Sequence, residues 1–315
     1  MLNIFYRLNE NIEMLQSNED FKTLRLEDVV WIDLMSPTGD EKRAVEAFLG
    51  TEIQSRAQAE EIESSSRFSE SDIAIFANTN YLTPAADGYT MDPVTFTVVG
   101  DTLTTLREIP LRSFTQLQRK IQAKPQQFSS GFVIFVSILD QRVDLDADIV
   151  EILSKETSLI SKRINQKEDI NEELLLDINQ LQENAMLLRE NVVDKQRLIS
   201  NIVKSERYPE QLEGKLNVLL QDISSLINHT NFSFERLEYL QDTVVGLINL
   251  EQNNIMKIFT FISLMLMPAT LVASFYGMNV HLPFEGFRFA WLLIAALMLV
   301  LIVGLWLVFK KRDMM

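Results

Sequence analysis

A stripe of polar and small residues follows one predicted helical segment near the C-terminal end of the chain. Positions that alternate in steps of four and three residues lie on one face of an α-helix. The stripe, called the polar seam below, consists of Asp242, Gly246, Asn249, Asn253, Met256, Thr260, Ser263, Met267, Thr270 and Ser274. It offers hydroxyl, amide and carboxylate oxygens with no Cys or His, a set that suits hard, hydrated cations better than soft metals.

Several residues on or beside the polar seam suggest how ions would be handled. Copies of Asp242 arranged in a ring would concentrate cations at one mouth of a pore. Met256, Phe259 and Met267 would form apolar girdles that gate by dewetting. Pro268 cannot donate to the carbonyl of Leu264, which therefore becomes either a further ligand or the site of a simple kink.

Two apolar segments near the C-terminus have the length that crosses a bilayer, about 20 residues. They cover residues 255–276 and 289–309, and the second is followed by a basic tail at residues 310–315. Basic residues beside a span favour the cytoplasmic side. The sequence therefore predicts a two-pass protein of the inner membrane, with both termini in the cytoplasm and an external loop at residues 277–288.

The first 125 residues mix strand and helix patterns. Runs rich in β-branched and aromatic residues predict strands at Leu2–Leu8, Val29–Leu34, Ile73–Tyr81, Pro93–Val99 and Thr102–Arg107. Gly100 and Asp101 predict a hairpin turn between the last two runs. Glu41–Leu49 and Phe114–Ala123 have helical spacing. Residues 1–125 are therefore predicted to form an α/β domain, and the whole chain an α+β protein.

Residues 126–208 predict two long antiparallel helices. Ile and Leu recur at three- and four-residue intervals in Ile134–Asn165 and in Glu172–Ser205. Asp144, Asp146 and Asp148 lie in the first of these patterns and lack the Gly and terminal Glu of an EF-hand loop. They are interpreted as a solvated helix face rather than as a metal site.

A third helix is predicted to begin near Pro209, to form a stalk over residues 209–254 and to continue into the first span. Pro is tolerated in a first helical turn, and the next Pro is Pro268. A helix from Pro209 to Tyr276 would be about 100 Å long, too long for a compact domain. Because a lone helix has no core of its own, association with further copies is expected.

Two interpretations of the polar seam remain open. A polar stripe against lipid is expensive, and a two-span chain cannot enclose water alone, so several copies would form a conduit around an axis. Ser263, Thr270 and Ser274 by themselves favour a helix-packing interface, where such residues are enriched. The continuity of the polar seam toward Asp242 favours the conduit.

Composition argues against other functions. The formal net charge of −15 is opposite in sign to the basic footprint of nucleic-acid-binding proteins, so no nucleic-acid partner is expected. The chain lacks a Gly-rich phosphate loop and a nucleophile motif, so neither an enzyme nor an organic cofactor is predicted. His229 and His281 are interpreted as surface residues. A membrane-anchored coiled-coil scaffold would explain the stalk but leaves the polar seam without a role.

Short motifs add a family resemblance. Tyr276-Gly277-Met278-Asn279, at the outer end of the first span, resembles the YGMN signature of the CorA family of divalent cation channels. Further segments that resemble this family are Val30–Leu34, Glu61–Phe68, Thr104–Glu108, Glu251–Asn253 and Met267–Ser274. The resemblance covers nearly the whole chain.

The resemblance implies a homopentamer, embedded in membrane lipid, that conducts Mg²⁺, with Co²⁺ and Ni²⁺ as further cargo. It implies that Gly277, Met278 and Asn279 form an external selectivity filter in which Asn279 is the first ligand of the hydrated ion. Asp242, Asn253, Met256, Met267 and Thr270 match pore-lining positions, with Asp242 as a second metal contact and Phe259 at the apolar constriction. It also implies that Mg²⁺ bound between cytoplasmic domains closes the channel as a regulatory ligand.

The loop after Asn279 departs from the family pattern. Members often continue with an acidic Met-Pro-Glu-Leu segment, whereas this chain continues with Val280–Phe287, in which only Glu285 is acidic. The departure leaves Co²⁺, Ni²⁺ and Zn²⁺ open as cargo. A transporter of zinc or another transition metal on the same scaffold is therefore the alternative.

Overall fold

The computed structural model describes residues 1–9, 11–16, 24–61, 67–85, 88–166, 168, 170–278 and 288–311. The chain divides into two compact units, Met1–Asp242 and Thr243–Met315. They are called the head and the C-terminal unit below, and each is described by itself.

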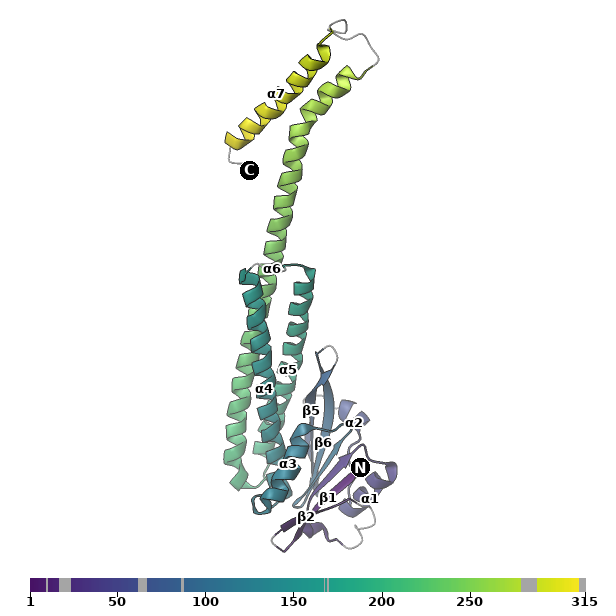
Figure 1. The fold of residues 1–315 in the computed structure, drawn as a ribbon. Coiled ribbons are helices and arrows are strands. Elements are labelled where there is room, and N and C mark those ends of the chain that lie inside the picture. Colours follow the sequence, from purple (N-terminus) through teal and green to yellow (C-terminus); the bar gives the residue numbers. More distant parts are fainter. Residues whose placement is uncertain are drawn as a thin grey trace. The chain divides into compact units, whose positions relative to one another are not determined.

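A mixed sheet of seven strands forms the base of the head (Figure 1). Its strands are β1 (Leu2–Leu8), β2 (Asn11–Leu15), β3 (Val29–Met35), β4 (Phe68–Glu70), β5 (Ala74–Ala85), β6 (Gly88–Val99) and β7 (Thr102–Arg107). The spatial order is β2-β1-β3-β7-β6-β5-β4. The pair β3 and β7 is parallel, with Trp31 opposite Leu103, and the other pairs are antiparallel.

The helices are α1 (Gly39–Leu49), α2 (Arg56–Glu61), α3 (Arg112–Ala123), α4 (Gly131–Gln166), α5 (Glu172–Lys204), α6 (Glu213–Tyr276) and α7 (Ala290–Lys311). Single 3₁₀ turns lie at Leu26–Asp28, Pro125–Gln127 and Glu210–Leu212. Local sequence fixes several ends. Thr38 and Glu41 form a reciprocal capping box that starts α1, and the Asn171 side chain accepts from the Leu174 N–H to start α5.

The sheet has an apolar core on each face. On one face, Ile4, Ile32 and Leu34 pack with Val45 and Leu49 of α1. On the other face, aromatic rings from the strands meet rings from the helices. The ring centroids of Phe5 and Trp31 are 4.7 Å apart, those of Trp31 and Phe114 are 5.9 Å apart, and those of Phe96 and Phe135 are 4.8 Å apart. Because successive side chains of a strand point to opposite faces, each face of the sheet carries apolar residues on which helices pack.

Within the head, α4, α5 and the first part of α6 lie side by side (Figure 1). The buried face of α6 here repeats at three- and four-residue intervals and consists of Leu216, Leu219, Ile223, Leu226, Thr230, Ser233, Leu237 and Leu240. Polar contacts fix the register of the three helices. Gln196 donates to the Ser224 hydroxyl at 3.0 Å, and Arg236 donates to the Ser158 hydroxyl at 3.3 Å. One face of α6 is thus used for packing inside the chain.

The start of α4 is pressed against the turn between β6 and β7. The Gly131 N–H donates to the Asp101 carbonyl at 2.6 Å. A Cβ at position 131 would lie 2.4 Å from the backbone nitrogen of Leu103, closer than side-chain atoms approach. Only glycine therefore permits this contact, which anchors the helical layer to the centre of the sheet.

The structure has all the strands predicted from the sequence, within a few residues, together with both long helices of residues 126–208 and the continuous third helix. The sequence patterns missed β2, β4 and α2. The interpretation of Asp144, Asp146 and Asp148 as a solvated face was wrong for one of them. Asp144 and Asp148 are exposed, but Asp146 is fully buried, because the buried cations Arg142 and Lys195 lie beside it.

A saturated ion pair lies at the junction of β3 and β7. Arg107 donates through Nε and Nη2 to the two carboxylate oxygens of Asp33 at 3.1 and 2.8 Å. The same carboxylate accepts from Thr105 at 3.1 Å and from Gln118 at 3.2 Å. Asp33 and Arg107 are both buried. Because every charge has a partner, this network ties the parallel strand pair to α3.

We expect Arg107→Ala to destabilise the head by about 3–5 kcal/mol, because the substitution leaves the Asp33 carboxylate buried without its cation. The measurement is the urea-unfolding free energy of the full-length protein in detergent, followed by the fluorescence of buried Trp31 in a Trp291→Phe/Trp306→Phe background. Arg43→Ala is the matched control, since Arg43 pairs with Asp40 at 2.5 Å on the exposed face of α1 and should cost less than about 1 kcal/mol. Equal losses in the two variants would contradict a stabilising role for the buried pair.

Candidate functional site

The C-terminal unit contains the last part of α6 and the whole of α7. By length and composition, the helical segments Glu210–Tyr276 and Ala290–Lys311 each contain a stretch that is long and apolar enough to cross a membrane. Most side chains of these stretches are exposed in the isolated chain, including Leu271 at 72% and Leu299 at 65%. Such extensive apolar exposure on a helix fits a lipid or protein environment rather than water.

The two helices of this unit pack through one stripe each. The half-buried residues of α6 in its apolar stretch are Phe261, Met265, Pro268, Ala269, Val272 and Tyr276. Those of α7 are Ala290, Ile294, Met298, Leu301, Ile302, Leu305 and Phe309. The rings of Phe261 and Phe309 meet edge to face, with centroids 5.5 Å apart. The pair therefore forms an antiparallel helical hairpin.

The polar seam lies on the face of α6 opposite to α7. An α-helix turns about 100° per residue, so Ser263 and Thr270 point away from Met265 and Val272, which lie toward α7. All the seam residues of this unit, from Gly246 to Ser274, are exposed. Met256 is 61% exposed, Met267 is 68% exposed, and Phe259 beside the seam is 63% exposed. The surface that carries the oxygen ligands is thus left uncovered by the described part of the chain.

The seam groups differ in how their polar atoms are satisfied. The Thr270 hydroxyl donates to the Leu266 carbonyl at 2.9 Å, which leaves its oxygen as an acceptor. The side chains of Asn249 and Asn253 are exposed amides that offer both acceptors and donors. Pro268 lies within a continuous α6, and its nitrogen has no hydrogen to donate to the Leu264 carbonyl. The seam can therefore present neutral oxygens to a passing ion.

The predicted filter is only partly described. Helix α6 ends at Tyr276, after which the Gly277 N–H donates to the Ala273 carbonyl at 3.0 Å. A Cβ at Gly277 would lie 3.2 Å from that carbonyl oxygen, so the turn is tight. Met278 follows with 53% of its surface exposed. Asn279, like His281 and Glu285, lies outside the described residues.

The charged residue of the polar seam, Asp242, belongs to the head. It is exposed and is the last residue of that unit. Within the C-terminal unit, the contact of Phe261 with Phe309 brings the ends that carry Lys257 and Lys310 to the same side of the hairpin. The Lys310 ammonium lies 4.9 Å from the centre of the Trp306 ring. Basic and aromatic residues at one end of a span are typical of a membrane interface.

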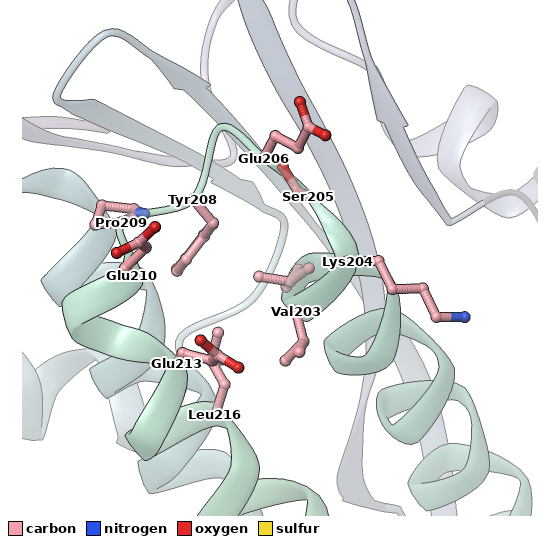
Figure 2. A pocket seen from close by; sticks show the side chains of 10 residues that line it. Val203, Lys204, Ser205, Glu206, Tyr208, Pro209, Glu210, Glu213 and Leu216 are labelled. Carbon is pink, nitrogen blue, oxygen red and sulfur yellow. The ribbon is translucent and has the colours of Figure 1, made fainter.

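The head contains a polar pocket at the turn between α5 and α6 (Figure 2), with a volume of about 280 Å³. Figure 2 shows Glu210 and Glu213 on the α6 side, near Tyr208, while Lys204 points away from them. Across the described part of the chain, no three His, Asp or Glu side chains converge to hold a metal ion. The residues that line the pocket lie between positions 202 and 216, within the head.

Sequence reasoning overlooked one feature of α6 in the head. The face opposite to the buried stripe exposes Val218, Ser225, Phe232 and Tyr239 at seven-residue intervals. Val218 is 59% exposed and Phe232 is 64% exposed. Continued through the sequence, the same seven-residue interval gives Gly246 and Asn253, which belong to the polar seam. A search for seven-residue repeats upstream of Asp242 could have found this row.

Comparisons with known proteins assign the family. Residues 27–311 match the family described as CorA-like Mg2+ transporter protein. Proteins named Magnesium transport protein CorA from Wolinella succinogenes and Campylobacter jejuni strain RM1221 are 32% and 30% identical over 321 and 326 residues, and each alignment covers 99% of both chains. The structure of the CorA magnesium transporter from Methanocaldococcus jannaschii has the same fold, with a TM-score of 0.81 at 17% identity over 99% of this chain and 98% of that chain. This chain therefore belongs to the CorA-like Mg²⁺ transporter family, whose members are transporters and channels rather than enzymes.

Proposed function

We propose that this protein is a channel of the inner membrane that admits Mg²⁺ through a path lined by the polar seams of several copies. The observation that carries the proposal is the position of the seam on the face of α6 opposite to α7. In the predicted span the seam carries the hydroxyls of Thr260, Ser263, Thr270 and Ser274, and a stripe of hydroxyls faces hydrocarbon at a cost. Copies of α6 that turn their seams toward a common axis, with α7 outside, satisfy the polar groups and enclose water.

The proposal assigns residues to successive depths. The copies number five, as the family resemblance implies, and both termini lie in the cytoplasm. Asn279, with Gly277 and Met278, forms the external filter, and Asp242 forms a carboxylate ring at the inner mouth. Mg²⁺ loses its water shell reluctantly, so neutral oxygens would accept the hydrogens of that shell rather than replace it. Mg²⁺ bound to the head from the cytoplasm is proposed to close the pore by favouring the closed state.

The orientation of the seam can be tested with single cysteines, since the natural chain has none. We expect Ser263→Cys to react with a charged, water-soluble methanethiosulfonate and ion flux to fall at least fivefold, because this position faces water. Ile262→Cys, at the same depth but beside the seam, should neither react nor lose flux. The measurement is Mg²⁺ uptake into liposomes before and after labelling. Faster labelling of the Ile262→Cys protein than of the Ser263→Cys protein would place the seam against protein or lipid.

We expect Asn279→Ala to reduce Mg²⁺ uptake into liposomes at least tenfold, because the first acceptor for the hydrated ion is removed. Asn254→Ala makes the same chemical change off the seam and should conduct like the wild type. Uptake of Mg²⁺, Co²⁺, Ni²⁺ and Zn²⁺ is compared, with and without Mg²⁺ on the head side. Undiminished flux in Asn279→Ala would refute the filter assignment, and Zn²⁺ flux above Mg²⁺ flux that follows a pH gradient would favour the transition-metal alternative.

Assembly can be tested on the exposed row of α6 in the head. We expect Phe232→Asp to shift the detergent-solubilised protein toward smaller species, because the row that contains Phe232 is proposed to face neighbouring copies. Leu176→Asp is the matched control, since Leu176 is 67% exposed on α5. Light scattering coupled to size-exclusion chromatography gives the mass. A change in mass in the Leu176 variant alone would show that the copies meet elsewhere.

A further inference from the structure

One exposed face of α7 carries a row of apolar side chains that ends in a cation. An α-helix turns about 100° per residue, so positions separated by four, three and four residues share one face. Leu299, Val303, Trp306 and Lys310 follow these steps, and all four are exposed. Their positions lie within about 60° of one another around the helix axis. This set is called the α7 row below.

The α7 row points away from α6. The face of α7 that packs on α6 includes the half-buried Met298, Leu305 and Phe309, and Phe309 contacts Phe261 of α6. This packed face lies about 120° around the helix axis from the α7 row. The described part of the C-terminal unit therefore leaves the α7 row uncovered.

The Lys310 side chain folds back along the helix toward the apolar part of the row. Its ammonium lies 4.9 Å from the centre of the Trp306 ring, which is one turn earlier on α7. A ring face attracts a cation but supplies no oxygen acceptor, so the N–H donors of the ammonium still lack oxygen partners there. The charge is therefore held beside the last apolar residues of α7, with its donors available.

The described residues of the C-terminal unit offer this ammonium no counter-charge. Glu251 is the only carboxylate among them. The contact of Phe261 with Phe309 shows which parts of α6 and α7 lie side by side, and Glu251 precedes Phe261 by ten residues, about 15 Å along α6. A negative partner for Lys310 therefore has to come from beyond the described residues.

The chemistry along the α7 row matches that of a phospholipid. Leu299 and Val303 offer an apolar surface to an acyl chain, and the indole of Trp306 suits the membrane interface. The Lys310 ammonium can donate charge-assisted hydrogen bonds to phosphate oxygens. Free inorganic phosphate would use the ammonium alone, whereas a lipid uses the whole row. A zwitterionic head group brings its own cation, so a lipid with net negative charge is the better partner.

We propose that the α7 row is a binding site for an anionic phospholipid, with the phosphate on Lys310 and an acyl chain along Leu299 and Val303. The proposal requires that α7 crosses the membrane, but it does not rest on the polar seam or on the ion that is transported. Lys310 and Lys311 both lie at the C-terminal end of α7, where cations interact favourably with the helix dipole. Only Lys310 belongs to the row, so the two lysines can be compared.

The fluorescence of Trp306 reports lipid contact directly. Full-length protein with Trp291→Phe is reconstituted into vesicles of equimolar phosphatidylcholine and phosphatidylglycerol, with bromine atoms on the acyl chains of one lipid or the other. Bromine quenches tryptophan only at short range, so the two samples show which lipid contacts Trp306. A Trp291→Phe/Trp306→Phe protein gives the signal of Trp31, which is subtracted. We expect phosphatidylglycerol to be favoured about fivefold, the effect of one lysine near an anionic surface.

Two lysine variants in the same Trp291→Phe background separate a site from general attraction. Lys310→Met keeps an unbranched side chain without the charge and should lose the preference for phosphatidylglycerol. Lys311→Met removes the same charge about 100° around the helix and should retain the preference. Equal losses in the two variants would show general attraction of charge. Equal quenching by both lipids before either substitution, or quenching by neither, would show that the row selects no lipid or is covered by protein. Each of these results overturns the proposal.

Discussion

The constraint on which the C-terminal unit depends is that hydrocarbon accepts no hydrogen bonds, so every amide or hydroxyl on a membrane helix must find a partner in protein or in water. Within the predicted span the Thr270 hydroxyl bonds to its own backbone, and Thr260, Ser263 and Ser274 expose further hydroxyl-bearing side chains on the same face. In this unit α7 covers an apolar stripe of α6 and leaves the opposite polar stripe open. In the proposed function, further copies of the chain cover that open side. The assembly that satisfies the polar groups is therefore the same assembly that forms the conducting path.

The head shows two outcomes of burying charge. Asp33 and Arg107 bind each other in a fork, and Thr105 and Gln118 use the remaining carboxylate positions. Such a saturated pair is rigid because no member can change its charge without a loss. The Lys195 ammonium is instead surrounded by three oxygens, from the Asp146 carboxylate of α4, the Asn191 side chain of α5 and the Asn80 carbonyl of β5. Since a buried charge is costly unless it is paired and hydrogen-bonded, these three acceptors are what allow the Lys195 ammonium to lie between the helices and the sheet.

The periodicity of the sequence predicted most of the helices and strands, but it did not predict which side chains from distant parts of the chain would meet. The strands at Leu2–Leu8 and Thr102–Arg107 and the long helices follow from side-chain spacing, as does the seam on α6. Strand β4, of three residues, is too short to show an alternation. The spacing of Asp144, Asp146 and Asp148 could not distinguish the buried carboxylate from the two exposed ones, because Lys195 approaches from a distant part of the sequence. The contact at Gly131 depends likewise on a turn that only the folded chain places beside it.

The proposed filter depends on the chemistry of its ligands as well as on the separation of α6 into a face covered by α7 and an open polar face. A neutral amide, such as that of Asn279, accepts hydrogens from the water shell of an ion without the strong attraction by which a carboxylate would retain the cation. It therefore selects on the size and hydration of the ion rather than on direct coordination. Because only Glu285 in the loop after Asn279 is acidic, attraction of cations to the outer mouth would be weak. On this proposal, membrane potential and the carboxylates of Asp242 at the inner mouth must supply most of the force that draws cations inward.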